Sequence, residues 1–492
     1  MKVSVIGTGY VGLVTATCLA YLGHDVACLD IDEKKIEGLK QGQIPIYEPN
    51  LDQLLEDTKK TSKFPIFTTD PKIAMEHGEI IFIAVGTPPK ENGEPDLRYI
   101  EACAKTIGKH AKQDCIVINK STVPVGSGNW VYMLIEQANP RLNFHVASNP
   151  EFLREGSAIF DTFYADRIVI GTEGTARKRA SSRPRRTSDR SVLQVHEDHE
   201  DDENAEIGVC EQSPDENFAR AKLKELYKPL IEQSFTSPSY CPRPNNQGQI
   251  PFISTDITSA EMIKYSANSF LAMKISFANQ IANICDLVGA DVTEVMHGIG
   301  TDSRIGGKFL NAGIGWGGSC FGKDVQALIK IAEEYDYNPE LLYGTTNVNY
   351  KQRNLVIKRL QDQMKILKGK KIGLLGLAFK PNTDDLRDAP ALDIARALIK
   401  LGASVSVTDP IAAENCKKQN PDLEVNYVND PYELAQGKDA LVLVTEWDEY
   451  RQLDLGKIFN SMNGPKILLD GRNIYSPVDA KKIGFNYISI GR

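Results

Sequence analysis

The sequence lacks features that mark several large classes of protein. No segment reaches the roughly 18 to 20 consecutive apolar residues that a helix needs to span a membrane. The nine cysteines are odd in number and form no C-x-x-C pair, so neither a disulfide framework nor a zinc or other metal site is indicated. A net charge of -8 argues against nucleic acid as the main partner. The first residues have the pattern of a strand rather than that of a signal peptide, so we expect a cytoplasmic protein.

The length of 492 residues is too great for one hydrophobic core and predicts two or three domains. One segment differs in composition, because residues 177–190 hold seven Lys or Arg residues and residues 197–206 hold seven Asp or Glu residues. Such a segment cannot bury enough apolar surface to order itself. We therefore predict a first domain over residues 1–174, a disordered insertion over 175–219, a central helical region over 220–345 and a last domain over 346–492.

The first domain opens with the pattern of a strand, a glycine-rich turn and a helix. A buried-strand pattern over residues 3–6 leads into Gly7, Gly9 and Gly12, and a helical pattern follows. These glycines permit a tight turn, close approach of a pyrophosphate and close packing of helix on strand. Asp30 ends the next predicted strand, where an acid binds the ribose hydroxyls, which favours NAD over NADP. The sequence therefore predicts an NAD-binding Rossmann domain.

Two further predicted strands of this domain end in polar loops that carry Thr87 and Thr122. Ligands of open α/β sheets bind at the carboxyl ends of the strands. Both hydroxyls shortly precede a proline and cannot continue into a helix, so we expect them to face the cofactor rather than only to form turns. Glu151 and Glu155 are predicted near the same edge.

Residues 317–324, Gly-Gly-Ser-Cys-Phe-Gly-Lys-Asp, place one thiol where a helix is predicted to begin. The amides of a first helical turn favour an anion, and Lys323 adds positive charge, so we expect the pKa of Cys320 to fall. Asp324 is expected one turn further along the helix. The alternative is an inert cysteine buried in a glycine-rich turn.

A long helix is predicted from residue 258 to 288, opened by a capping box of Thr258 and Glu261 and ended by Gly289. Lys264 and Asn268 are four residues apart and share one face of it. An ammonium and an amide placed in this way could both meet a developing alkoxide. An ordinary polar stripe on an exposed face fits the spacing equally well.

The second half repeats the order of a strand, a glycine turn and a helix from residue 371 onward. Its turn, residues 376–380, lacks the triple-glycine pattern and fits the phosphate of a nucleotide sugar better than a second dinucleotide. Phe379 could stack, and Lys380, Arg387 and Arg472 are candidates for binding an anion, although each could also be a surface charge. The predicted fold class is α/β, with two Rossmann-like parallel-sheet domains joined by a long central helix.

In this order, residues 7–12, 121–124 and 149–153, the pair of Lys264 and Asn268, and residues 317–324 and 376–380 resemble the UDP-glucose/GDP-mannose dehydrogenase family. The resemblance covers nearly the whole chain outside residues 176–218. Residues 47–49 and 470–472 look more like the branch that oxidises UDP-glucose than those that oxidise GDP-mannose or UDP-N-acetylmannosamine. The resemblance implies that the last domain binds the UDP-sugar. The apolar character of the predicted helix over residues 258–288 suggests burial against a partner subunit or against both domains, so we expect a homodimer or a higher homo-oligomer.

The resemblance further implies a four-electron oxidation, in which the C6 alcohol of UDP-glucose becomes an aldehyde and then a carboxylate while two NAD are reduced in succession. Cys320 would trap the aldehyde as a thiohemiacetal that is oxidised to a thioester. Lys264 and Asn268 would stabilise the oxyanion, and Asp324 would hold a water. The resemblance implies that Thr122, Glu151 and Glu155 support catalysis, and it leaves open which of the carboxylates is the base. The residues implied to contact NAD are Gly7, Gly9, Tyr10, Val11, Gly12, Asp30, Lys35, Thr87, Thr122, Glu155, Lys323 and Arg387. Those implied to bind the substrate are Glu151, Phe152, Leu153, Lys264, Asn268, Gly317, Phe379, Lys380 and Arg472, while Arg304 would reach the substrate of a neighbouring subunit.

Two alternatives stay open at this point. A sibling dehydrogenase would act on GDP-mannose or UDP-N-acetylmannosamine. A non-catalytic sensor built on the same scaffold would bind NAD and a nucleotide sugar without turnover, but it would not need Cys320, Lys264, Asn268 and Asp324 together.

Overall fold

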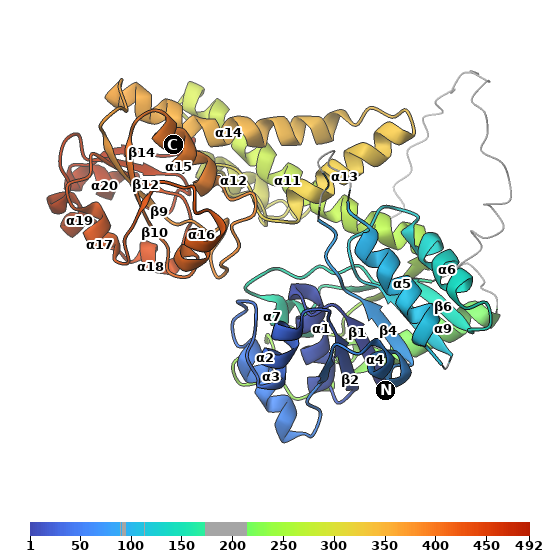
Figure 1. Cartoon of the computed structure of the whole chain (residues 1–492). Coiled ribbons are helices and arrows are strands. Elements are labelled where there is room, and N and C mark those ends of the chain that lie inside the picture. Colours follow the sequence, from blue (N-terminus) through green and yellow to red (C-terminus); the bar gives the residue numbers. More distant parts are fainter. Residues whose placement is uncertain (89, 91–94, 113, 173–213) are drawn as a thin grey trace, which may run out of the picture.

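The computed structural model describes all residues except 89, 91–94, 113 and 173–213. Two α/β domains lie at opposite ends of the molecule, and long helices connect them (Figure 1). The predicted fold class is confirmed by two separate, largely parallel sheets. The predicted insertion falls mostly outside the described residues. Within the described part of the chain, no helix is long and apolar enough to cross a membrane.

The first sheet has eight strands in the order β3-β2-β1-β4-β5-β6-β7-β8. Neighbouring strands are parallel except β6 and β7, which are antiparallel. The carboxyl ends of β1, β2, β4 and β5 therefore meet at one edge, where the glycine turn and both predicted threonine loops lie. The strands are β1 (Lys2–Ile6), β2 (Asp25–Leu29), β3 (Ile66–Thr68), β4 (Ile80–Ile83), β5 (Cys115–Asn119), β6 (Phe144–Ser148), β7 (Ile168–Thr172) and β8 (Phe252–Asp256).

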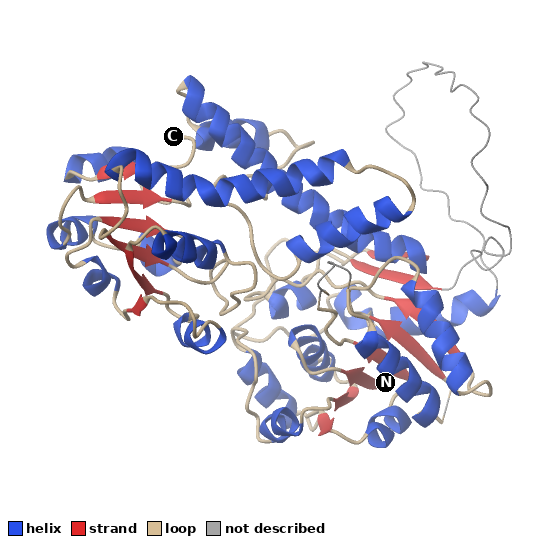
Figure 2. Ribbon diagram, turned by 45° about the horizontal axis from the view of Figure 1, so that its top comes forward, coloured by secondary structure: helices blue, strands red, loops and turns tan. Residues whose placement is uncertain are grey.

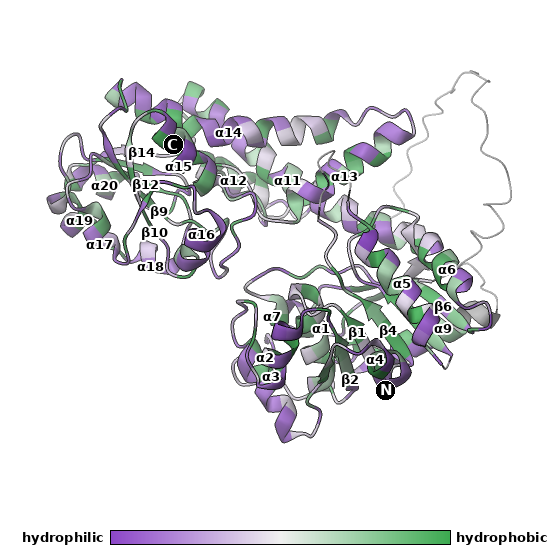
Figure 3. Ribbon diagram, viewed as in Figure 1, coloured by the Kyte–Doolittle hydropathy of each residue, from purple (hydrophilic) through white to green (hydrophobic). Residues whose placement is uncertain are grey.

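Helices cover both faces of this sheet, so its strands are apolar on both sides (Figures 2 and 3). One core packs the sheet against helices that include α1, α3 and α7, and the other packs it against α4, α5 and α6. The helices of this domain are α1 (Tyr10–Tyr21), α2 (Glu33–Lys40), α3 (Leu51–Lys60), α4 (Pro71–His77), α5 (Arg98–His110), α6 (Ser127–Ala138), α7 (Ala158–Phe163), α9 (Pro214–Leu226) and α10 (Lys228–Ile231).

Helix α11 (Ile257–Val288) joins the two domains. Its first residue, Ile257, belongs to a core of the first domain, whereas Ala278, Ala282 and Cys285 belong to the core of the second. A helix of 32 residues is about 48 Å long, which is enough to reach from one core to the other. The remaining connecting helices are α12 (Val292–Gly300), α13 (Phe321–Glu334) and α14 (Glu340–Met364). The predicted boundary between residues 345 and 346 falls inside α14.

The second sheet has six parallel strands in the order β11-β10-β9-β12-β13-β14. The turn after β9 again lies beside a crossover in strand order, where α/β sheets bind ligands. The elements are β9 (Lys371–Leu375), α15 (Pro390–Lys400), β10 (Ser404–Thr408), α16 (Ala413–Gln419), β11 (Asn426–Tyr427), α17 (Pro431–Ala435), β12 (Ala440–Leu443), α18 (Asp448–Arg451), α19 (Leu455–Ser461), β13 (Ile467–Asp470), α20 (Pro477–Ile483) and β14 (Asn486–Ile488).

Candidate active site

The turn between β1 and α1 has the shape of a dinucleotide cradle. A side chain at Gly12 would lie 1.9 Å from the carbonyl oxygen of Gly7, so helix and strand approach too closely for any other residue. A Cβ at Gly9 would meet nothing within 4 Å, which leaves the backbone open to a ligand. Val11 lies in the first turn of α1, whose amides face this opening. The cradle therefore fits the pyrophosphate of NAD.

Asp30 follows β2 at the edge of this cradle. Its carboxylate accepts hydrogen bonds from the backbone N–H of Thr8 at 2.9 Å and from the Thr8 hydroxyl at 2.6 Å, and it pairs with Lys35 at 3.2 Å. Burial opposes its charge, but these donors outweigh burial and keep the pKa of Asp30 below its usual value. A carboxylate held ionised in this position suits the ribose hydroxyls of NAD.

The hydroxyl of Tyr10, a residue that is predicted to contact NAD, points to Glu48. The Tyr10 hydroxyl donates to the Glu48 carboxylate, and the backbone N–H of Gly156 lies 2.8 Å from the Tyr10 oxygen and 2.7 Å from Glu48. Glu48 also accepts from the N–H of Ala158 at 2.7 Å. Tyr10 and Glu48 thus fix the loop that carries Glu155.

The two threonine loops contact one another. The Thr87 hydroxyl donates to the backbone carbonyl of Thr122 at 2.7 Å, and Lys323 donates to the Thr87 hydroxyl at 3.3 Å. Lys323 comes from α13, so these contacts link the edge of the first sheet to the helix that begins at the candidate nucleophile.

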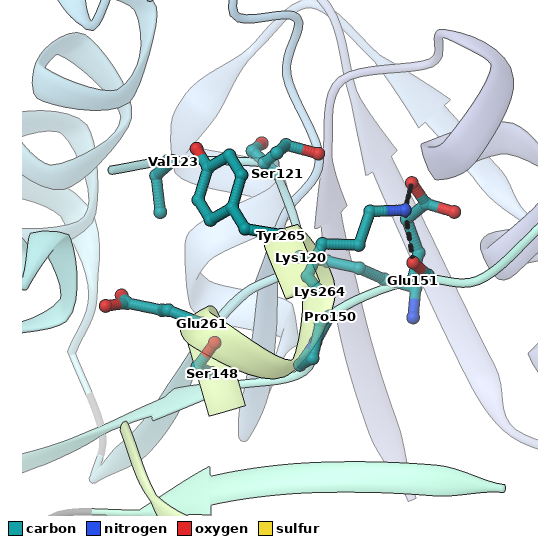
Figure 4. A pocket seen from close by; sticks show the side chains of 10 residues that line it. Lys120, Ser121, Val123, Ser148, Pro150, Glu151, Glu261, Lys264 and Tyr265 are labelled. Atoms are coloured by element: carbon teal, nitrogen blue, oxygen red, sulfur yellow. Dashed lines mark hydrogen bonds and ion pairs between the residues drawn. The ribbon is translucent and has the colours of Figure 1, made fainter. Parts of the chain in front are cut away.

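A buried ion pair lies beside this edge. The Lys264 ammonium donates to the Glu151 carboxylate at 2.8 Å and to the Glu151 carbonyl at 2.7 Å, and both side chains are at most 7% exposed (Figure 4). Burial disfavours both charges, yet each partner stabilises the other, so the pKa of Lys264 is raised and that of Glu151 is lowered. The pair therefore stays ionised, and Glu151 is a poor proton acceptor in this state.

Asn268 and Asp324 form a second buried pair, with the amide of Asn268 donating to Oδ2 of Asp324 at 2.6 Å. Oδ1 of Asp324 is buried and makes no hydrogen bond with the residues that the structure describes; Lys323 lies 3.8 Å from it. Burial raises the pKa of Asp324. This oxygen is therefore a ready acceptor for a donor that enters the site.

Cys320 is the N-cap of α13, as predicted, and it is exposed, whereas the other seven cysteines that the structure describes are buried. The prediction that its pKa falls is wrong. The surrounding protein displaces water from around the thiol, and Glu151 and Asp324 add negative charge, so the pKa of Cys320 is raised despite the nearby Lys264. Local sequence showed the helix terminus and Asp324, but it did not show Glu151, which the fold brings from the first domain, or the loss of water around the thiol.

The residues before Cys320 pack directly on the second domain. Gly318 has a φ of 89°, and a side chain there would lie 2.7 Å from the ring of Phe379. A side chain at Gly317 would lie 2.2 Å from the carbonyl oxygen of Asp388. The Lys380 ammonium lies 5.5 Å from the centre of the Phe379 ring. Phe379 therefore lies against the loop that leads to Cys320, and Lys380 lies beside Phe379.

Glu155 connects the two domains. It accepts hydrogen bonds from Arg387 at 2.9 Å and from the Thr383 hydroxyl at 3.3 Å. Burial and the adjacent Asp385 raise the pKa of Glu155 to about 7, although Arg387 opposes this. Two residues predicted to contact NAD, Glu155 of the first domain and Arg387 of the second, therefore contact one another.

The other predicted substrate residues are more dispersed. Phe152 lies under Lys264, 5.6 Å from its ammonium, and the N–H of Leu153 donates to Glu151 at 2.8 Å. Arg304 is exposed and pairs with Asp302, away from these contacts.

Arg472 lines a cavity of about 420 Å³ together with residues of α12 and of the loop 307–312. Its guanidinium donates to the carbonyls of Val444 at 2.7 Å and of Gly315 at 3.0 Å. Arg472 therefore braces the wall of this cavity, which has the volume of a small-molecule site.

Three family models match the chain in succession. The NAD binding domain of the UDP-glucose/GDP-mannose dehydrogenase family matches residues 1–184, its central domain matches residues 258–351, and its UDP binding domain matches residues 373–477. UDP-glucose 6-dehydrogenase TuaD of Bacillus subtilis is 44% identical over 100% of this chain and 93% of that protein. The chain belongs to the UDP-glucose/GDP-mannose dehydrogenase family. The resemblance read from the motifs is confirmed, and so is NAD as the cofactor.

Further relatives also match this dehydrogenase over its whole length. UDP-glucose 6-dehydrogenase of Rhizobium meliloti is 42% identical over 100% of both chains. The solved structure of a UDP-glucose dehydrogenase from Pyrobaculum islandicum superposes with a TM-score of 0.82 at 33% identity, covering 100% of this chain and 98% of that one.

Sequence reasoning misread or missed several residues of this dehydrogenase. The cap of α11 is Asp256, which accepts from the N–H of Ser259 at 2.8 Å, so the predicted capping box of Thr258 and Glu261 is wrong. Glu261 instead accepts hydrogen bonds from the backbone at the start of α6, from Gly126 and Gly128, which lie 135 and 133 residues earlier in the chain. Lys120 was not singled out, yet burial lowers its pKa to about 8 beside Glu151. No local pattern reveals such contacts, because their partners are distant in sequence.

Proposed function

We propose that this chain oxidises the C6 alcohol of UDP-glucose to the carboxylate of UDP-glucuronate, in two hydride transfers to NAD. The observation that carries the proposal is the exposed thiol of Cys320, set between an NAD cradle and a UDP binding domain and bordered by two buried pairs, Lys264 with Glu151 and Asn268 with Asp324. A protein that only binds its ligands has no need of an exposed thiol flanked by a buried ion pair and a buried, hydrogen-bonded carboxylate. The relatives with 36–44% identity over the full chain carry the name UDP-glucose 6-dehydrogenase.

Bound NAD supplies the acceptor for the hydride that leaves C6. The chain's own residues hold the substrate and move protons. Asp324 offers an unpaired buried oxygen one helical turn from Cys320 and can accept a proton, directly or through a water. Lys264 and Asn268 keep the hydroxyl oriented, because both present N–H donors on the same face of α11.

After the first oxidation, the thiol of Cys320 gives its proton to Asp324, directly or through a water, and its sulfur adds to the aldehyde carbon at C6. This step forms a C–S bond and places negative charge on the former carbonyl oxygen. Lys264 and Asn268 stabilise this oxygen, since their donors shift from Glu151 and Asp324 toward it. Loss of a second hydride leaves a thioester on Cys320. Water then cleaves the C–S bond, which releases the carboxylate and restores the thiol.

The second domain would bind the nucleotide. Phe379 and Lys380 lie against the loop before Cys320, and Arg472 borders the cavity of about 420 Å³ beside α12. Arginine and lysine are suited to a diphosphate, and a ring is suited to stacking or packing.

We also propose a homodimer or higher homo-oligomer. An exposed apolar stripe on α11 carries Phe270, Phe277 and Ile284 at intervals of seven residues, and it continues in Leu287, which is 85% exposed. Such a stripe is typical of a helix packed on a partner. Arg304, exposed at the end of α12, would then reach the site of the second subunit. The expected cytoplasmic location stays a prediction.

A substrate panel tests the proposal. UDP-glucose, GDP-mannose and UDP-N-acetylmannosamine are each incubated with NAD, and NADH is counted against sugar consumed. We expect two NADH per UDP-glucose and little turnover of the others. One NADH per sugar with free aldehyde would refute the covalent scheme, and preference for another sugar nucleotide would reassign the enzyme to a sibling branch. Cys320→Ser should stop the second oxidation while NAD binding survives.

A further inference from the structure

Glu261 is a buried carboxylate of α11 with no place in the chemistry described above. It is only 4% exposed, and it points away from the pair of Lys264 and Glu151 (Figure 4). Its two oxygens accept hydrogen bonds from the backbone N–H of Gly126 at 2.6 Å and of Gly128 at 3.1 Å. Both amides belong to the start of α6.

Helix α6 begins at Gly126, which has a φ of 94° and no side chain with which to cap the helix. The first amides of a helix need acceptors from outside it. Glu261 supplies them from another helix, and the contact is close, because a side chain at Gly128 would lie 2.5 Å from Ile257 of α11. The start of α6 is therefore held on α11 at two points, one apolar and one hydrogen-bonded.

The loop that carries Thr122 runs directly into this capped end. Pro124 stiffens it, and its carbonyl accepts from the N–H of Ser127 at 3.1 Å and from the Ser127 hydroxyl at 2.6 Å. A cavity of about 10 Å³ separates residues 121–123 from Glu261, Lys264 and Tyr265. Ser121 holds the start of this loop by donating to the carbonyl of Val85 at 2.7 Å, and Val123 is buried in the core that also contains Ile257 of α11. The hydrogen bonds of Glu261 therefore act at the far end of the loop.

We propose that Glu261 is a positioning residue that fixes Thr122 relative to Lys264, by tying the start of α6 to the helix that bears the lysine. The role rests on the proposed function together with the role that the family resemblance implies for Thr122, which is to support hydrolysis of the thioester on Cys320. The other end of the loop is held by Thr87, which donates to the carbonyl of Thr122 at 2.7 Å. Loss of Glu261 therefore frees the end of the loop that leads into α6 and leaves the contact between Thr87 and Thr122 in place.

The electrostatics fit this role. Burial, assisted by Asp256 one turn earlier, raises the pKa of Glu261 to about 7, whereas the amides of Gly126 and Gly128 lower it. The carboxylate is therefore kept in an unfavourable place by its two backbone donors. A residue that served packing alone would need no charge there.

The test uses the full-length enzyme with Glu261→Gln, which keeps the volume but replaces one acceptor oxygen by an N–H donor. Glu294→Gln is the matched control, because Glu294 is an exposed carboxylate in α12. Each variant is mixed with UDP-glucose and excess NAD, NADH release is followed by absorbance, and acid-quenched protein is weighed by intact mass spectrometry. Hydrogen exchange at Gly126 and Gly128, measured without substrate, reports on the cap itself.

We expect Glu261→Gln to release about two NADH per subunit at the normal rate and then to turn over about tenfold to a hundredfold more slowly, as a misplaced catalytic group would cause. Intact mass should show the sugar nucleotide on Cys320. Combination with Thr122→Ala should add little further loss, because the two residues act through one step. Faster exchange at the two amides should accompany these changes, and the control should behave as the unmodified enzyme.

An unchanged steady-state rate without a covalent adduct would overturn the proposal, as would equal slowing of both oxidations with a fully additive double variant. If Glu261→Gln does not fold, Glu261→Asp decides, since it keeps the charge but withdraws both oxygens by one methylene. A normal rate in that variant with faster exchange at the amides would likewise refute the positioning role. Absence of NADH formation by the unmodified enzyme would refute the proposed function instead.

Discussion

Replacement of Glu151 by Gln should destabilise the first domain strongly, because it leaves the Lys264 ammonium buried without a counter-charge. The two charged groups lie 2.8 Å apart, and neither side chain is more than 7% exposed. At an effective dielectric constant near 20, two unit charges at this distance attract by about 6 kcal/mol. Much of this attraction is offset by the cost of burying both ions, but removal of one partner exposes that cost in full.

We therefore expect a loss of about 3 to 5 kcal/mol in the free energy of unfolding. In a domain of this size each kcal/mol lowers the melting temperature by about 2 to 4 °C, so the expected shift is about 6 to 20 °C. Differential scanning calorimetry of the apoprotein measures it. The matched control is Glu101→Gln, which breaks the exposed pair with Lys105 and should cost at most about 1 kcal/mol.

The loss should also depend on pH in a defined direction. Because the folded-state pKa of Glu151 is lowered, its contribution is present above its unfolded pKa of about 4.3 and is lost as the pH falls through the folded value. The folded-state pKa of Lys264 is raised, so its contribution is present below about 10.4 and is lost only at higher pH. The difference in melting temperature between the unmodified protein and the Glu151→Gln variant should be largest between about pH 5 and 10 and should disappear in acid. A shift no larger than that of the control, or one independent of pH, would refute the buried ion pair.

Four further predictions follow from the same geometry. Iodoacetamide should alkylate Cys320 ahead of the buried cysteines, at a rate that still rises above about pH 8.5, whereas a plateau below pH 7 would show a lowered pKa. Arg387→Gln removes a cation that lowers the pKa of Glu155, so the acid limb of the kcat/KM profile should move to higher pH. Asp30→Ala should raise the KM for NAD about tenfold to a hundredfold with kcat less affected. Asp324→Asn should lower kcat by about a hundredfold or more, and an unchanged kcat would exclude it as proton acceptor.

The elements that depend on local pattern could be predicted from the sequence. The glycine turn after β1, the strand that ends before Asp30 and the end of α11 at Gly289 all lie where the residues indicate. Each rests on neighbours within a few positions, since strand alternation, a tight turn and a left-handed glycine need no distant partner. The start of α11 was predicted one residue late, because the aspartate before it caps the helix.

What could not be predicted depends on partners far apart in the chain. Glu261 fits a capping box by spacing, yet its carboxylate is used by α6, and only the packing of two helices decides between these roles. The pKa of Cys320 was predicted from its own helix, whereas the displaced water and the distant carboxylate of Glu151, added to Asp324 of the same helix, raise it. The stabilisation of a thiolate by a helix terminus is small beside the cost of removing its charge from water, so burial decides the direction in which the pKa shifts.

The carboxylates Glu151 and Asp324, whose roles sequence spacing alone does not distinguish, have pKa values that shift in opposite directions. A proton acceptor works best when its pKa lies near the pH at which the enzyme works, because an acid with a lower pKa binds the proton too weakly. Glu151 is held ionised by Lys264 with its pKa lowered, so it binds a proton weakly. Asp324 has a raised pKa, an oxygen without a hydrogen bond and a place one turn after a thiol whose pKa is also raised. The exposed thiol therefore stays protonated near neutral pH, and Asp324 rather than Glu151 is the carboxylate better suited to receive its proton.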